Sequence, residues 1–139
     1  MSLLTENVIN FGVAGADAGT TDVESAVFDT LGMSSVVAMA RLAVANSGNY
    51  LKLQHSDASG SGFEDILGSK IVCAVNHQVL VSEIVRPIKR YLKAILVRTS
   101  SSASGDILFI GAAPRVTPAD NTTSAVLAEI LVSPDSGTA

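Results

Sequence analysis

Few side chains of this sequence combine the type and spacing that catalysis requires. Cys73, His77 and His55 are the candidate nucleophile and bases, and a cysteine protease needs a thiolate and an imidazole that converge, with a third group orienting the base. In one extended strand the α-carbons of Cys73 and His77 would lie roughly 13 Å apart at about 3.3 Å per residue. Cys73 is therefore interpreted as a small core residue, and the chain is predicted not to be an enzyme.

Metal-binding chemistry has one partial candidate. Two histidines and one cysteine without a close-set pair do not make a zinc site. Residues 57–62, DASGSG, have oxygen donors at alternate positions and glycine at the sixth, as in the first half of a calcium-binding loop. Gly68 stands where that loop needs its bidentate glutamate, so calcium would have to recruit Glu64 or Asp65 by another geometry. The segment is interpreted as a polar hairpin turn, with calcium as the alternative, and no cofactor or metal is predicted.

Glycosidase and nucleotide-binding chemistry lack the residues they need. Glu64 and Asp65 are adjacent, so in an extended chain they point to opposite faces and cannot share a proton or a substrate. Gly12, Gly15 and Gly19 are not followed by the lysine and hydroxyl that a phosphate-binding loop uses. These glycines indicate a flexible segment instead.

The elements that must position these residues are strands. Apolar segments of strand length alternate with clusters of Ser, Gly, Asp, Asn and Pro. Residues 34–48 are rich in alanine and open to a helical interpretation. Their valines, the turn at 46–48 and the alternating segment 50–54, which would pair with them, favour a strand. The predicted strands cover 4–11, 23–28, 34–48, 50–54, 66–75, 79–85, 90–99, 107–112 and 125–132.

These segments predict a single all-β domain, an antiparallel β-sandwich of jelly-roll type with an aliphatic core. Residues 1–22 are expected to form a strand and a flexible arm, residues 23–132 the sandwich, and residues 133–139 a disordered tail. The run at 100–105 is expected to be a hairpin loop. Pro87, Pro114 and Pro118 are expected to end strands, because proline lacks the N–H that a central strand requires.

The composition indicates a surface that is short of charge. Of the 139 residues, 16% are charged and 47% hydrophobic, against about a quarter charged in an average soluble domain. Apolar patches covered by copies of the chain or by a partner are therefore expected, and with them a homo-oligomer. A net charge of -4 and 4% aromatic residues argue against nucleic-acid binding. Charged residues interrupt the most apolar segments, and the first residues do not resemble a signal peptide, so neither a membrane span nor secretion is expected.

The charges are unevenly distributed along the chain. The first 30 residues contain five acidic residues and no basic one, whereas Arg86, Lys89, Arg90 and Lys93 cluster later. Such asymmetry would either steer subunits together in register or belong to a solvated strand end.

Three blocks of the sequence resemble a recurring pattern in small structural proteins of tailed bacteriophages. They are LKLQHSD at 51–57, FEDILG at 63–68 and KRYLKAILVRTSSSASGDILFIGAAPR at 89–115. The family pattern reads roughly LQ-SDDG-W-D, then KRYVR with an apolar strand, a Ser/Thr/Gly turn and a small-residue segment with proline. This chain departs from the pattern at Ala58, where a second acid is usual, and at Phe63, where tryptophan is usual.

The resemblance implies a capsid decoration or cement protein, a jelly-roll-like oligomer, commonly a trimer, that binds the major capsid protein. It would be synthesised in the host cytoplasm and lie on the surface of the phage head. The alternative is a carbohydrate- or receptor-binding module of a phage particle. In either case loop tips are the expected contacts, because they carry binding more often than strands do. The candidate contact residues are Ser56, Asp57, Ser59, Ser61, Ser100, Ser101, Ser102 and Asp106.

Overall fold

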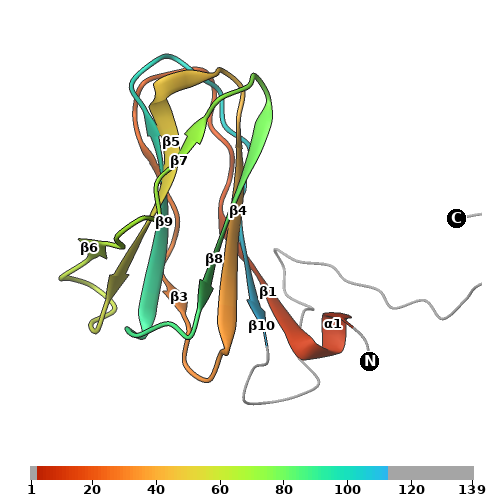
Figure 1. The fold of residues 1–139 in the computed structure, drawn as a ribbon, viewed down its shortest axis with the longest axis vertical. Coiled ribbons are helices and arrows are strands. Elements are labelled where there is room, and N and C mark those ends of the chain that lie inside the picture. Colours follow the sequence, from red (N-terminus) through yellow and green to blue (C-terminus); the bar gives the residue numbers. More distant parts are fainter. Residues whose placement is uncertain (1–2, 113–139) are drawn as a thin grey trace, which may run out of the picture.

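The chain folds into two antiparallel β-sheets that lie face to face, seen as two layers in Figure 1. The computed structural model describes residues 3–112. The predicted all-β class is confirmed, and the sheets are not closed into a barrel. The elements are α1 (Leu3–Glu6), β1 (Asn7–Val13), β2 (Val23–Glu24), β3 (Phe28–Asp29), β4 (Ser35–Leu42), β5 (Asn46–Ser56), β6 (Glu64–Asp65), β7 (Ile71–Cys73), β8 (Gln78–Val85), β9 (Tyr91–Arg98) and β10 (Ile107–Ala112).

Within residues 3–112, the strands pair from the first and the last strand inward. β1 pairs with β10, β9 pairs with β2 and β3, β4 pairs with β8, and β5 pairs with β6 and β7. Successive pairs alternate between a sheet of order β1-β10-β4-β8 and a sheet of order β2-β9-β5-β6, with β3 also on β9 and β7 also on β5. The chain is therefore one long antiparallel ribbon wrapped into two layers.

Two predicted strand pairings are wrong, because each involves a segment that crosses from one sheet to the other. β4 and β5 do not pair, since both edges of β4 are occupied by β10 and β8. The run at 100–105 does not close a hairpin, since β9 and β10 belong to different sheets. The hairpin predicted from β5 into the following segment is confirmed, because β6 pairs with the end of β5.

Several strand boundaries also differ from the prediction. Residues 4–6 belong to the helical turn α1, and the segment 66–75 contributes only β7. The segment 23–28 is divided into β2 and β3 because the Ser25 side chain enters the ladder. Its Oγ accepts the Ala94 N–H at 2.9 Å, where a continuous strand would offer a backbone carbonyl.

The Pro87 prediction is confirmed, since β8 ends at Val85. The predicted strand ends at Pro114 and Pro118, the strand at 125–132 and the tail from 133 lie outside the described residues.

The core lies between the two sheets and is filled by alternate residues of each strand. On β4 the inward residues Val36, Ala38, Ala40 and Leu42 are buried, as the period of two requires. The rings of Phe28 and Phe109 stack with centroids 5.2 Å apart and join the sheets. A Cβ on Gly111 would lie 3.1 Å from the Phe28 ring, so this glycine makes room for that contact. Cys73 is buried in the same core, as predicted.

Arg98 fixes the loops at the end of the sandwich where β9 finishes. Its side chain is buried, with the residue 4% exposed. The guanidinium donates to the carbonyl oxygens of Thr21 at 2.7 Å, Asp17 at 2.8 Å and Ser102 at 2.6 Å. These carbonyls belong to two loops, 14–22 and 99–106, so one cation holds both.

The loop 14–22 consequently differs from the flexible arm that its glycines predicted. The Gly15 N–H donates to Asp106 Oδ1 at 2.7 Å, and the Ala16 N–H donates to Ser104 Oγ at 3.0 Å. Together with the Arg98 contacts, these bonds fasten the segment along its length to the loop after β9.

Replacing Arg98 with Lys is expected to destabilise the fold by about 2 kcal/mol or more, because an ammonium on one stem cannot reproduce the guanidinium fork and leaves buried carbonyls without donors. Urea unfolding followed by circular dichroism measures the change. Arg86→Lys, at an exposed position after β8, is the matched control and should stay within about 0.5 kcal/mol of the wild type. Equal stability of the two variants would contradict the role given to Arg98.

Candidate interaction surfaces

The two predicted contact loops lie at opposite ends of the sandwich. In the ladder between β5 and β9, Ser56 is opposite Tyr91 and Asn49 is opposite Arg98. The turn at 56–63 therefore shares an end with Pro87, here called the Pro87 end, and the loop at 99–106 lies at the other, here called the Ser102 end. Figure 1 shows the Pro87 end at the bottom and the Ser102 end at the top. The two loops cannot form one continuous contact patch.

At the Pro87 end, Ser56 has a structural role. It is buried, and its Oγ donates to the Ser61 carbonyl at 2.5 Å and accepts the Ala58 N–H at 3.0 Å. These bonds close the turn and leave this hydroxyl unavailable to a partner. The remaining predicted contacts in the turn, Asp57, Ser59 and Ser61, are exposed.

At the Ser102 end, Ser102 is likewise used inside the fold. It is completely buried, and its Oγ accepts the N–H groups of Ala43 at 3.1 Å and Val44 at 3.0 Å. The fully buried position excludes Ser102 as a surface contact in this conformation. Ser101 is exposed and Ser100 half-buried. Asp106 is exposed and, as described above, holds the Gly15 N–H.

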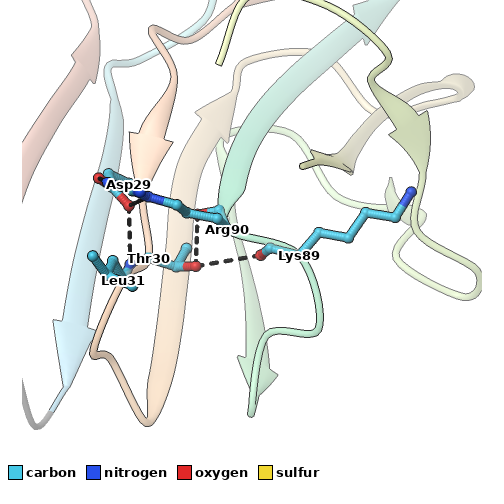
Figure 2. A network of polar contacts seen from close by, with 5 residues as sticks. All are labelled: Asp29, Thr30, Leu31, Lys89 and Arg90. Atoms are coloured by element: carbon cyan, nitrogen blue, oxygen red, sulfur yellow. Dashed lines mark hydrogen bonds and ion pairs between the residues drawn. The ribbon is translucent and has the colours of Figure 1, made fainter. Parts of the chain in front are cut away.

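An ion pair between Asp29 and Arg90 organises the Pro87 end (Figure 2). Arg90 Nη2 lies 2.8 Å from Asp29 Oδ2, and Nε lies 3.0 Å from Oδ1. The Leu31 N–H donates to Asp29, and the Thr30 hydroxyl donates to the Arg90 carbonyl at 2.7 Å. The hydrogen bond from Arg90 lowers the pKa of Asp29 below its usual value, and the Leu31 N–H acts in the same direction. The turn after β3 is thereby fixed to the start of β9.

Two of the three other basic residues near this end are also paired within the chain, and the exposed Arg86 forms no ion pair within residues 3–112. Lys89 Nζ lies 2.8 Å from Glu64 Oε2, and Lys93 Nζ lies 3.1 Å from Glu24 Oε2. Figure 2 shows the Lys89 side chain extending away from the Asp29 pair. The hydrogen bond from Lys89 lowers the pKa of Glu64. The uneven charge distribution of the sequence therefore brings acids and bases together inside one fold.

Exposed apolar side chains surround this ionic cluster. Ile88 is 84% exposed and Leu31 is half-exposed, in the turns that follow β8 and β3. Beside them is a cavity of about 160 Å³ lined by residues that include His55, Ile66 and Pro87. The Pro87 end thus presents aliphatic side chains on a backbone held by ion pairs.

The candidate catalytic residues are divided between the two ends. Cys73 ends β7 and His77 precedes β8, so the chain turns between them and the two residues do not share a strand. The Cys73 thiol is buried and lies 3.3 Å from the Val75 carbonyl, whereas His77 is exposed at the Ser102 end. His55 lines the cavity at the Pro87 end.

The two acids that a calcium ion would recruit are engaged by other groups. Glu64 pairs with Lys89, and Asp65 accepts hydrogen bonds from Gln54 at 2.7 Å and Lys52 at 3.0 Å. The hydrogen bond from Gln54 is the largest cause of the lowered pKa of Asp65, and the hydrogen bond from Lys52 acts in the same direction. Over residues 3–112, no group of three His, Cys, Asp or Glu side chains is placed to hold a metal ion.

The outer face of the four-stranded sheet is an apolar surface that the sequence reasoning missed. The outward side chains of β4 and β8 form it, with Val79 58%, Val81 50% and Val85 66% exposed. The segment 79–85 has the composition of a strand. Apolar residues occupy both of its faces, and this pattern is the sequence signal that could have revealed the surface. We call this surface the valine face; it consists of Val37, Met39, Val79, Val81 and Val85.

Comparisons with models of protein families, with curated proteins and with solved structures find no match for this chain. Within residues 3–112, no helix has the length and apolarity needed to span a bilayer.

Removal of the Asp29 charge is expected to reduce stability in a pH-dependent way. The folded-state pKa of Asp29 lies below its ordinary value, so the stabilisation is fully present above the unfolded-state pKa and is lost as the pH falls through the folded-state pKa. Asp29→Asn should therefore be less stable than the wild type near neutral pH, and the difference should vanish in strongly acidic solution.

Urea midpoints measured over that pH range test this expectation. Asp57→Asn, in the exposed turn after β5, is the matched control for removal of a carboxylate charge. A difference between the wild type and Asp29→Asn that does not change with pH would show that the ion pair with Arg90 is not its cause.

Proposed function

We propose that this protein is a virion structural protein that binds the assembled head of a tailed bacteriophage and stabilises it through protein–protein contacts. Its partners are the major capsid protein and further copies of itself, and its place is the surface of the head. The observation that carries the proposal is the strand pairing, in a chain whose central blocks resemble phage structural proteins.

The pairing order supports a sandwich of jelly-roll type. If β2 and β3 count as one strand and β6 and β7 as another, the described residues contain eight strands. They pair first with last, second with seventh, third with sixth and fourth with fifth. A long antiparallel ribbon wrapped into two four-stranded sheets is the jelly-roll arrangement, which viral capsid proteins and lectins use. Fold alone does not give function, so the sequence resemblance must decide between these uses.

The blocks that carry the resemblance form one structural unit. The first supplies most of β5, the second contains β6, and the third begins at Lys89 and continues through β9 and β10. β5 and β9 are neighbours, with Leu51 opposite Leu96. The two bases that open the third block, Lys89 and Arg90, hold Glu64 and Asp29. The resemblance therefore follows contacts that build the Pro87 end, which supports its use in assigning a function.

The Pro87 end is the part of the molecule that we propose to contact the shell. It presents the exposed side chains of Leu31 and Ile88 together with the predicted contacts Asp57, Ser59 and Ser61. A cement protein acts by bridging neighbouring capsid subunits, because its interface adds to theirs and makes local opening more costly. Many equivalent sites then multiply a modest affinity at each site.

The full chain is expected to co-sediment with emptied heads of the phage that encodes it, and to saturate at a fixed ratio to the major capsid protein. Ile88→Asp should weaken this binding by roughly tenfold or more, because a buried isoleucine contributes about 1.5–3 kcal/mol. Val75→Asp is the matched control, because Val75 is 62% exposed at the Ser102 end and should leave binding unchanged.

Absence of saturable binding to heads would contradict the proposal. Retention on immobilised polysaccharide without binding to heads would favour the carbohydrate-binding alternative. Equal loss of binding in the two variants would remove the assignment to the Pro87 end.

A further inference from the structure

The valine face combines apolar side chains with two opposite charges in a defined register. In the ladder between β4 and β8, Met39 is opposite Val81, Arg41 is opposite Val79, and Val37 is opposite Glu83. The pair Met39–Val81 therefore lies between Arg41 and Glu83. Arg41 is two residues from this pair in one direction along the strands, and Glu83 is two residues from it in the other direction. Both are exposed, and within residues 3–112 neither takes part in an ion pair.

We infer that the valine face is the interface between two copies of this chain, related by a two-fold axis that crosses the strands at the level of Met39 and Val81. The inference specifies the self-association that is part of the proposed function, and its test does not depend on binding to heads. Such an interface is isologous, because the same patch is used by both subunits and must be complementary to itself.

The positions of the two charges select this axis. A two-fold rotation about an axis perpendicular to the strands places Arg41 of one copy above Val37 of the other copy. In that other copy Val37 is opposite Glu83, which is one strand away. Neighbouring strands lie about 4.8 Å apart and packed sheets about 10 Å apart, so the long Arg41 side chain can reach the partner's Glu83. An axis parallel to the strands would instead bring Arg41 close to Arg41 and Glu83 close to Glu83. The axis perpendicular to the strands is therefore favoured, because it gives two contacts between opposite charges in each dimer.

The apolar part of the face fits the same occupant. At the axis Met39 and Val81 meet their own copies, and Val79 lies beside them on the edge strand β8. Aliphatic residues with a single cation and a single anion at symmetric positions form a surface that is complementary to itself. A partner of uniform charge would leave Arg41 or Glu83 facing a like charge.

Charge reversal and rescue test the two-fold pairing on the full chain. Sedimentation equilibrium of the wild type is expected to show a monomer–dimer equilibrium. Arg41→Glu and Glu83→Arg should each weaken association by roughly tenfold or more, because two attractive contacts become repulsive. The double variant should restore the association of the wild type. Asp57→Arg makes the same charge change in the exposed turn at the Pro87 end and should leave association unchanged.

A second readout identifies what covers the face. Val81→Cys introduces an accessible thiol into a chain whose only cysteine, Cys73, is buried. Its alkylation should slow as the protein concentration rises, because the partner copy covers position 81. Fast alkylation at every concentration would show that no copy of the chain covers position 81, which overturns the inference. A trimer whose stability is unaffected by the single reversals would also overturn it, while binding to heads would remain a separate result.

Discussion

The contacts made by β9 are the constraint on which the rest of the structure depends. β9 pairs with β5 over eight residues and with β2 and β3 on its other edge, so within residues 3–112 it is the only strand of its sheet that joins β2 and β3 to the middle of the chain. Its basic residues reinforce this position. Arg90 holds Asp29, Lys93 holds Glu24, and Arg98 holds the carbonyls of the loop before β2. The irregular segment from 17 to 29 has few ladder bonds of its own, and these three cations fasten it to the sheet. Contacts from β9 therefore fix the turns and loops at both ends of the sandwich.

This arrangement explains the uneven distribution of charge and changes its interpretation. An acidic first segment and a later basic cluster could have steered separate subunits together. In the structure they meet within one chain, where Asp29 and Glu24 neutralise Arg90 and Lys93. Surface ion pairs contribute little stability each, but here they set the position of turns that the ladder leaves undetermined. The exposed Arg41, Glu83 and Arg86 take part in no ion pair within residues 3–112, so these charges remain available for contacts with a partner.

The sequence predicts the strands better than it predicts their partners. Alternation of apolar and polar residues is local, which is why β8 and β10 fall close to the expected residues. The choice of partner depends on contacts far apart in the chain. Local turn signals favoured a turn at 46–48, which the structure includes in β5, and a hairpin at 100–105, where the chain instead crosses between the sheets. The same limit applies to the contact residues. Ser56 and Ser102 have the composition of loop tips, yet each hydroxyl satisfies backbone groups inside the fold. Only the register of β5 against β9 reveals that their loops lie at opposite ends.

The separation of the surfaces has a consequence for assembly. The Pro87 end and the valine face involve different residues, so one chain can use both at once. A two-fold axis that crosses the strands reverses their direction, and the Pro87 ends of the two copies then point away from each other. If the Pro87 end binds a shell as proposed, a pair of this kind would attach through only one of its two Pro87 ends and would present the other outward. If the pair persists on the head, each binding site carries two chains; if shell contact and pairing compete, it carries one. The trimer that the family resemblance implies would instead carry three. The ratio of this chain to the major capsid protein on saturated heads therefore reports how the two surfaces are combined, because the three arrangements differ in whole numbers of chains per site.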